Sequence, residues 1–214
     1  MDAAGLGELL LREGINPEVV AAMMRVPRDR FVPHDLRARA WENTALPLRD
    51  GQTISQPSVV AVMTQAVAVG PGDRVLDVGT GSGYQAAVLA ACGARVHSIE
   101  RIPALAEAAR RTLAELGVEV AVHVGDGSLG LPTEAPFDAI VVAAAARAVP
   151  PALVQQLAPP TAGRRGGRLV LPIGPPADRS TGQELVLLER TADGVSRRAL
   201  LKVLFVPLVS QGQG

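Results

Sequence analysis

The sequence predicts an α/β fold: a mostly parallel, doubly wound sheet that ends in antiparallel strands. From residue 74 onward, short apolar stretches alternate with helical patterns, which is typical of a parallel sheet with helices on both faces. A glycine-rich turn joins the first of these strands to its helix. Neither an internal repeat nor a linker divides the sequence, so we expect one domain over 1–214, with an N-terminal helical segment at 1–70 and an α/β core at 71–214.

The composition disfavours several classes of protein. The 214 residues suffice for one sizeable core, and because 48% are hydrophobic but only 2% aromatic, that core must consist of Ala, Val and Leu. The 21 basic and 21 acidic residues cancel, so no net charge attracts nucleic acid or a membrane surface. The longest apolar run, 139–146, is far shorter than the ~20 residues that a membrane span needs.

Cysteine and histidine usage indicates neither a disulfide nor a metal. Cys92 is the single cysteine, so it has no intrachain partner, as expected in a reducing cytoplasm. The three histidines are scattered, and none forms a pair at the spacing of helical metal ligands. The start of the chain carries Asp2 and no basic-then-apolar signal pattern. We therefore expect a cytoplasmic protein without a metal.

The N-terminal segment predicts short helices and loops. Two helices are expected within 3–25, and another at 35–42. The stretch 26–33 is bounded by prolines and cannot form one regular element. A polar loop is expected at 46–57, and the apolar residues of 58–69 recur at helical spacing.

The rest of the chain predicts the sheet and its covering helices. The expected strands lie at 74–78, 95–99, 119–124, 137–143 and 167–173, and the expected helices at 85–92, 103–116 and 151–157. Two further strands, at 183–189 and 196–206, are expected to pair antiparallel because they follow each other without a crossover helix.

The turn after the first strand has glycine at every second position. Gly79, Gly81 and Gly83 follow an apolar strand that contains Asp77. Glycine allows positive φ and leaves no Cβ in the way, so backbone N–H groups can approach a polar ligand closely. A dinucleotide fingerprint requires its third glycine one position later, where this chain has Tyr84, and this disfavours an NAD-linked dehydrogenase.

Acidic residues follow the next two strands at the same edge of the sheet. Glu100 lies about 20 residues after the first glycine, where a carboxylate can accept both ribose hydroxyls. Asp126 can accept from an exocyclic amino group such as that of adenine, while the N–H of Gly127 donates to a ring nitrogen. An ordinary Asp-Gly turn is the alternative. Three polar features on one edge, in this order, indicate a nucleoside-cofactor site.

With these motifs in place, the chain resembles the protein-L-isoaspartate O-methyltransferase family over about 14–208. The glycine turn resembles the S-adenosylmethionine loop shared by all class I methyltransferases. The family-specific stretches are Val-Pro-Arg-Asp-Arg-Phe-Val-Pro at 26–33, Gly-Gln-Thr-Ile-Ser-Gln-Pro at 51–57 and Phe-Val-Pro-Leu at 205–208. The second is the strongest signal, because generic methyltransferases lack it. The resemblance implies a Rossmann-like class I methyltransferase domain, with 1–70 on the substrate side and 71–214 binding the cofactor.

The resemblance also implies an activity and a set of site residues. S-adenosylmethionine would methylate the free α-carboxylate of L-isoaspartyl residues in damaged proteins or peptides and leave S-adenosylhomocysteine. The ester would then collapse to a succinimide, whose hydrolysis returns some normal aspartate. Ser55 would be the active-site serine, and no metal is implied. The implied cofactor contacts are Thr53, Ile54, Asp77, Gly79, Gly81, Ser82, Glu100, Asp126 and Gly127.

The chemistry of carboxylate methylation suits these residues. A carboxylate has a pKa of about 4 and is already an anion at neutral pH, so it needs no general base. The sulfonium activates the methyl group, and in-line positioning can supply roughly 7–11 kcal/mol. The hydroxyl of Ser55 is suited to orient the carboxylate as a donor. The alternative is that this hydroxyl bonds its own loop backbone.

Two segments depart from the family pattern. Arg147 follows the alanines of 143–146 where the family usually has proline, and it either pairs with a substrate carboxylate or lies on the surface. The stretch 159–168 is longer than the family's turn and carries three arginines. A solvated loop is favoured there over a nucleic-acid or acidic-peptide patch, because no aromatic residues are interleaved.

These departures leave the acceptor open. A broad repair enzyme is the first interpretation, and a dedicated enzyme that methylates one ribosomally made peptide is the second. A catalytically silent cofactor-binding protein is the third, although the intact motifs argue against it. We expect a monomer whose partners are isoaspartyl-containing proteins or peptides, not nucleic acid or membranes.

Overall fold

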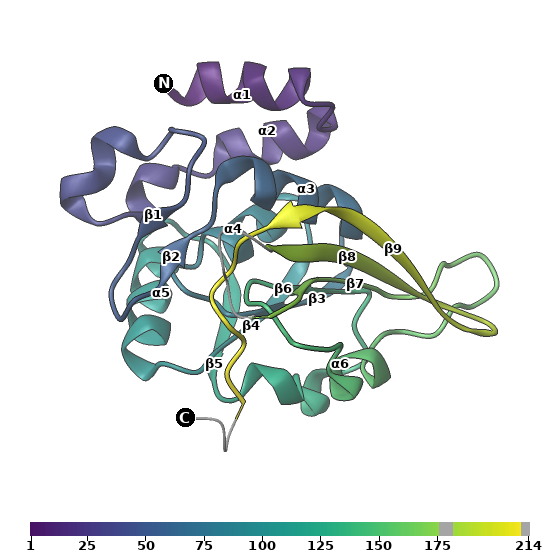
Figure 1. Cartoon of the computed structure of the whole chain (residues 1–214). Coiled ribbons are helices and arrows are strands. Elements are labelled where there is room, and N and C mark those ends of the chain that lie inside the picture. Colours follow the sequence, from purple (N-terminus) through teal and green to yellow (C-terminus); the bar gives the residue numbers. More distant parts are fainter. Residues whose placement is uncertain (176–181, 211–214) are drawn as a thin grey trace.

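The computed structural model describes residues 1–175 and 182–210. Its central sheet consists of β3 (Arg74–Val78), β4 (Arg95–Glu100), β5 (Val120–Val124), β6 (Ala139–Val142), β7 (Arg168–Ile173), β8 (Gln183–Thr191) and β9 (Gly194–Val203). The strands lie in the order β5-β4-β3-β6-β7-β8-β9 (Figure 1). Neighbours from β5 to β7 are parallel, and β8 and β9 each pair antiparallel. The predicted fold class is confirmed.

Helices lie on both sides of the sheet. They are α1 (Ala3–Arg12), α2 (Pro17–Arg25), α3 (Pro57–Val67), α4 (Tyr84–Ala91), α5 (Pro103–Glu115) and α6 (Pro151–Gln155). Short 3-10 helices are η1 (Arg28–Phe31), η2 (His34–Arg39), η3 (Gly127–Leu129) and η4 (Pro132–Glu134). In Figure 1, α1, α2 and α3 lie above the sheet and α6 lies below it.

The central strands are buried on both faces. Val75 of β3 belongs to the same apolar cluster as Met63 of α3 and Leu89 of α4. The next residue, Leu76, points to the other face and belongs to the cluster of Leu153 in α6. Strands covered on both faces are apolar at nearly every position, which explains why short apolar runs predicted them correctly.

The N-terminal segment packs on the helix that follows the glycine turn. Leu6 of α1, Met23 of α2 and Phe31 of η1 share a third apolar cluster with Tyr84, the first residue of α4. The rings of Phe31 and Tyr84 meet edge to face, with centroids 5.6 Å apart. The segment is therefore anchored beside the predicted cofactor turn.

Sequence patterns were less accurate in this segment. The expected helix at 35–42 is the 3-10 helix η2, and 26–33 contains η1 between its prolines. The expected loop at 46–57 contains an antiparallel ribbon of β1 (Leu46–Pro47) and β2 (Thr53–Ile54). Elements this short have no periodicity to detect, because their geometry is set by tertiary contacts.

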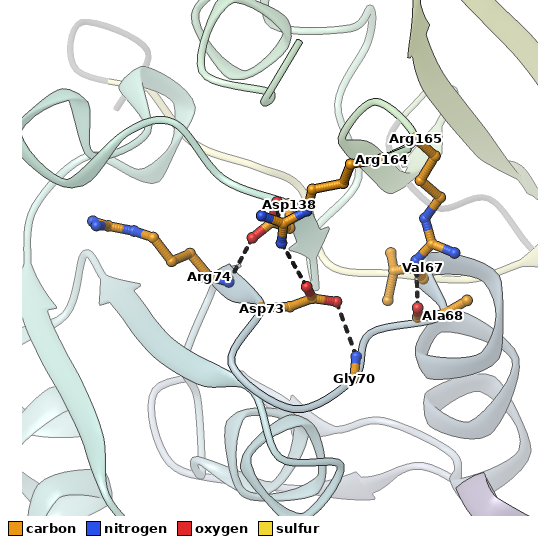
Figure 2. A network of polar contacts seen from close by, with 8 residues as sticks. All are labelled: Val67, Ala68, Gly70, Asp73, Arg74, Asp138, Arg164 and Arg165. Carbon is orange, nitrogen blue, oxygen red and sulfur yellow. Dashed lines mark hydrogen bonds and ion pairs between the residues drawn. The ribbon is translucent and has the colours of Figure 1, made fainter. Parts of the chain in front are cut away.

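The arginine-rich stretch 159–168 is bonded to the start of β3. Arg164 forms ion pairs with Asp73 at 2.8 Å and Asp138 at 3.0 Å (Figure 2). Asp73 also accepts from the backbone N–H of Gly70 at 2.9 Å, which closes the turn before β3. Residues 161–165 are exposed, as expected of a solvated loop, but Arg164 is also paired with two carboxylates within the chain.

The same stretch donates hydrogen bonds to the carbonyl oxygens at the carboxyl end of α3. Arg165 donates to the carbonyls of Val67, at 3.1 Å, and Ala68 (Figure 2). Arg168 donates to the carbonyl of Ala66 at 3.3 Å. The last carbonyls of a helix have no intrahelical donor, and Ala68 adopts the left-handed φ of 48° that favours glycine. The arginines compensate for an otherwise poor helix end.

We expect Arg165→Ala to lower the free energy of unfolding by about 1–2 kcal/mol, because it removes charged donors from the end of α3. Urea denaturation measures this loss. Arg147→Ala is the matched control, since Arg147 is also an exposed loop arginine but bonds nothing in the described part of the chain. Equal stability of the two variants would contradict the capping role.

Candidate active site

A cavity lies at the carboxyl ends of β3 and β4, between the glycine turn and the N-terminal segment. Most of the predicted site residues line it: Thr53, Ile54, Ser55, Gly79, Gly81, Ser82, Glu100 and Gly127. Its wall is completed by the segment 206–209 near the end of the described chain. The stretch 51–57 and the glycine turn, which are distant in sequence, therefore meet at one site.

Backbone geometry explains the glycines at this cavity. Gly79 and Gly81 have φ of 91° and 52°, a region that side chains rarely adopt. Gly83, with φ of 90°, lies in the same region, and a Cβ there would in addition lie 3.3 Å from Leu113 of α5. A Cβ at Gly127 would lie 2.5 Å from a methyl group of Val78, so only glycine fits between β3 and η3.

Glu100 holds the glycine turn. One carboxylate oxygen accepts from the N–H of Gly81 and the other from the N–H of Ile102, both at 2.9 Å. The residue is only 7% exposed and lines the cavity. Each carboxylate oxygen has a second lone pair, so the predicted acceptance of ribose hydroxyls is compatible with these bonds.

Asp77 lies behind the turn rather than in the cavity wall. It is fully buried, and one of its oxygens accepts from the hydroxyl of Ser98 at 2.7 Å. The Ser98 hydroxyl lies 2.5 Å from that of Thr80, which belongs to the turn. Burial raises the pKa of Asp77 to about 7, although the bond from Ser98 opposes this shift. Asp77 therefore reaches the turn through Ser98 and does not itself line the site.

Asp126 likewise stabilises a turn. Its carboxylate accepts from the N–H of Ser128 at 2.9 Å and from the Ser128 hydroxyl at 2.6 Å, and so caps η3. The neighbouring Gly127 lines the cavity, whereas Asp126 is outside the lining. The alternative of an ordinary Asp-Gly turn thus describes part of its role, and contact with adenine remains a prediction.

Ser55 lies between β2 and α3 with its hydroxyl unengaged by the rest of the described chain. Its carbonyl accepts from Arg28 at 2.7 Å. The alternative in which the hydroxyl bonds its own loop is therefore wrong within the described residues. The hydroxyl is available as a donor to a ligand in the cavity.

The segment 206–209 borders the cavity beside the alanines that follow β6. Ala145 donates to the carbonyl of Val206, and Leu208 donates to the carbonyl of Ala145, both at 2.8 Å. A neighbouring groove continues along 207–210, and the exposed Arg147 borders it. Sequence reasoning missed the wall at 206–209 and the role of Arg28, although both lie in stretches that the resemblance had marked.

Comparisons with known proteins agree with this geometry. A sequence model described as protein-L-isoaspartate(D-aspartate) O-methyltransferase matches residues 5–213. The chain belongs to this family. It is 51% identical to the protein-L-isoaspartate O-methyltransferase of Methylorubrum populi over 94% of this chain and 91% of the relative. The enzyme of that name from Aeropyrum pernix is 50% identical over 95% of this chain and 78% of the relative.

Solved structures of the family share the fold. One protein-L-isoaspartate O-methyltransferase has a TM-score of 0.84 and 28% identity, covering 100% of this chain and 67% of its own. A putative family member from Plasmodium falciparum, in complex with S-adenosyl-L-homocysteine, has a TM-score of 0.81 and 25% identity. That match covers 98% of this chain and 99% of the Plasmodium chain. The similarity therefore includes the N-terminal segment as well as the sheet.

Within residues 1–175 and 182–210, every helix is too short or too polar to span a bilayer. Over the same residues, no three His, Cys, Asp or Glu side chains are grouped so as to hold a metal ion.

The buried Asp77 predicts a pH-dependent stability in the absence of cofactor. Its pKa rises from about 4 in the unfolded chain to about 7 in the folded one, so folding takes up a proton between these values. The stabilisation is complete below the unfolded pKa and is lost as the pH rises through the folded pKa. From pH 5 to pH 8 the free energy of unfolding of the wild type should fall by up to about 3 kcal/mol more than that of Asp77→Asn.

Urea denaturation at both pH values measures this difference. Asp35→Asn, which changes an exposed carboxylate, is the control and should follow the wild type. Parallel pH profiles for the wild type and Asp77→Asn would contradict the assigned pKa.

Proposed function

We propose that this protein transfers a methyl group from S-adenosylmethionine to the free α-carboxylate of L-isoaspartyl residues in damaged proteins and peptides. The observation that carries the proposal is that the family-specific stretch 51–57 and the glycine turn line one cavity. The stretch 51–57 is characteristic of isoaspartyl methyltransferases, and the glycine turn is characteristic of S-adenosylmethionine binding. The ester product forms a succinimide, whose hydrolysis restores some normal aspartate.

The residues at the cavity fit S-adenosylmethionine, which supplies an activated methyl group when bound. Glu100 is buried at the end of β4, and we assign it to the ribose hydroxyls. Gly79 and Gly81 leave the main chain open to close approach, and Gly127 is assigned to adenine. Thr53 and Ile54 would lie between cofactor and acceptor. Asp77 is assigned an indirect role in holding the turn.

In the proposed mechanism, Ser55 orients the acceptor carboxylate and the wall excludes water. The acceptor is already an anion, so no proton has to be removed before transfer. The hydroxyl of Ser55 donates to one carboxylate oxygen and leaves the other directed at the methyl group. Ile54 and the segment 206–209 contribute apolar side chains to the lining of the cavity. The site thus supplies placement rather than acid–base catalysis.

The proposal extends to partners and location. The acceptors are isoaspartyl-containing proteins and peptides rather than nucleic acid or membranes, since the basic and acidic residues balance. We also propose that the protein acts as a monomer. The single cysteine, Cys92, supports a cytoplasmic location.

A second candidate keeps the chemistry but restricts the acceptor to one ribosomally made peptide. The observation that favours it is Arg147, which is exposed at the groove beside the cavity and bonds nothing in the described part of the chain. A free arginine there could recognise an acidic residue of a dedicated partner.

Methyl transfer from labelled S-adenosylmethionine distinguishes the two candidates. The acceptors are a short isoaspartyl peptide and the same peptide with normal aspartate. We expect base-labile label in the isoaspartyl peptide alone. Absence of label from both peptides, with S-adenosylhomocysteine still bound, would contradict general repair and favour the dedicated acceptor.

Ser55→Ala should lower turnover of the isoaspartyl peptide about 10–100-fold, because a hydrogen bond to a charged group is lost. The dissociation constant of S-adenosylhomocysteine should stay within about twofold, since this hydroxyl is assigned to the acceptor. Ser58→Ala is the control, because Ser58 lies three residues further on, in the first turn of α3, where its hydroxyl accepts from Gln56 and is outside the cavity lining. Unchanged turnover in Ser55→Ala would remove Ser55 from the mechanism.

A further inference from the structure

Arg28 is a buried cation that connects the acceptor loop to the cofactor turn. Its side chain is 0% exposed, although arginine is among the residues least often buried. Nε donates to the carbonyl of Ala40 at 2.8 Å, and Nη2 donates to the carbonyl of Ser55 at 2.7 Å. The guanidinium carbon lies 4.7 Å from the centre of the Tyr84 ring.

Packing alone does not explain this cation. Among the described residues, no carboxylate forms an ion pair with Arg28, and its Nη1 has no hydrogen-bond partner. Burial lowers the pKa of Arg28 to about 10, so the group is still charged at neutral pH. Burying a charge without a carboxylate is costly, and well-packed apolar residues often replace buried charges without loss of stability. The burial of Arg28 therefore requires an explanation other than packing.

The carbonyl that Arg28 holds belongs to the residue assigned to the acceptor. Fixing the carbonyl of Ser55 fixes the peptide plane between Ser55 and Gln56, which contains the Cα atom of Ser55, and so limits where the side chain on that Cα can lie. No other hydrogen bond in the described chain restrains that carbonyl. The guanidinium is planar and presents its donors in a rigid fork, so it can set this position more narrowly than an ammonium could.

The other contact of Arg28 reaches the cofactor side. Tyr84 begins α4 directly after the glycine turn, and both Tyr84 and Ser55 line the cavity. The face of the Tyr84 ring attracts a cation, and this attraction is larger when both groups are desolvated. Arg28 thus contacts one residue on each side of the space between cofactor and acceptor.

We propose that Arg28 is a positioning residue for methyl transfer, which holds Ser55 at a fixed place relative to the cofactor turn. The inference rests on the proposed function of Ser55. Arg28 itself is outside the cavity lining and acts through the carbonyl of Ser55 and the ring of Tyr84.

A double-mutant cycle tests the proposal. Arg28→Lys keeps a charge but loses the fork, and Arg28→Met keeps similar volume without charge. Each variant should lower kcat for the isoaspartyl peptide about 10–100-fold while the KM for S-adenosylmethionine changes little, because misplacement of a reacting group has costs of this size. In a Ser55→Ala background the same changes should lower kcat less than about twofold, because the group being positioned is absent.

Arg25→Met is the matched control. Arg25 also donates to a backbone carbonyl, that of Ala91, at 2.6 Å, but on the far end of α4 from the turn. We expect unchanged kcat in this variant. Equal losses from the Arg28 variants with and without the Ser55 hydroxyl would overturn the proposal and leave Arg28 a purely structural residue.

Amide hydrogen exchange provides a readout that does not depend on activity. Arg28→Met should exchange faster at 53–56 than the wild type, while exchange in β3 and β6 stays the same. Unchanged exchange at 53–56 would overturn the positioning role even if the wild type methylates no isoaspartyl peptide. A wild type that is inactive, with loosened exchange in Arg28→Met, would instead contradict the proposed function and support the positioning of Ser55 by Arg28.

Discussion

The cofactor side of the site depends on the hydrogen bonds that the carboxylate of Glu100 accepts. Parallel pairing of β3 with β4 brings the ends of the two strands together, with Val78 opposite Ile99. From there Glu100 reaches the N–H of Gly81 at 2.9 Å, and the N–H of Gly79 bonds the carbonyl of Ile99 at the same distance. The glycine turn is thus fixed by its neighbouring strand before any ligand binds, which lowers the entropic cost of binding.

The acceptor side is assembled on this fixed turn by residues far away in the sequence. Tyr84 follows the turn directly and supports η1 through Phe31 and Arg28. Arg28 in turn holds the carbonyl of Ser55, and buried Gln85 of α4 bonds Thr64 of α3 at 3.0 Å. The arginines of 159–168 secure the opposite end of α3 (Figure 2). Every family-specific stretch therefore contacts either the cavity or the helix that begins at it.

Sequence patterns predicted the features that depend mainly on neighbouring residues in the chain. The strands of the sheet follow from apolar runs, and the positive φ of Gly79 and Gly81 follows from the absence of a side chain. Burial of individual acids was not predictable, because Asp77 and Glu100 look alike in sequence, although the first is sealed behind the turn and the second lines the cavity. The difference follows from their positions, because Asp77 lies within β3 whereas Glu100 is the last residue of β4, at the edge of the sheet where the cavity lies.

Contacts between distant segments were also not predictable from the sequence. The bond from Arg28 to Ser55 spans 27 residues, and the bonds from Arg165 to the end of α3 span nearly 100. No pattern in either segment specifies its partner. The loop that carries Arg164 and Arg165 is exposed, as its composition indicated, but the sequence did not predict the two ion pairs and the carbonyl bonds that hold its arginines against the rest of the protein.

The charge balance of the proposed reaction gives a reason for placing a hydroxyl, and not a cation, beside the acceptor. A cationic sulfonium and an anionic carboxylate become a neutral thioether and a neutral ester, so charge is lost on the way to the transition state. A nearby arginine would stabilise the ionised carboxylate more than the transition state and would raise the barrier. A neutral donor such as Ser55 orients the carboxylate with less of this penalty, and apolar walls favour the loss of charge. The cation of Arg28 is compatible with this requirement because it is bonded to carbonyls behind the loop and lies outside the cavity lining.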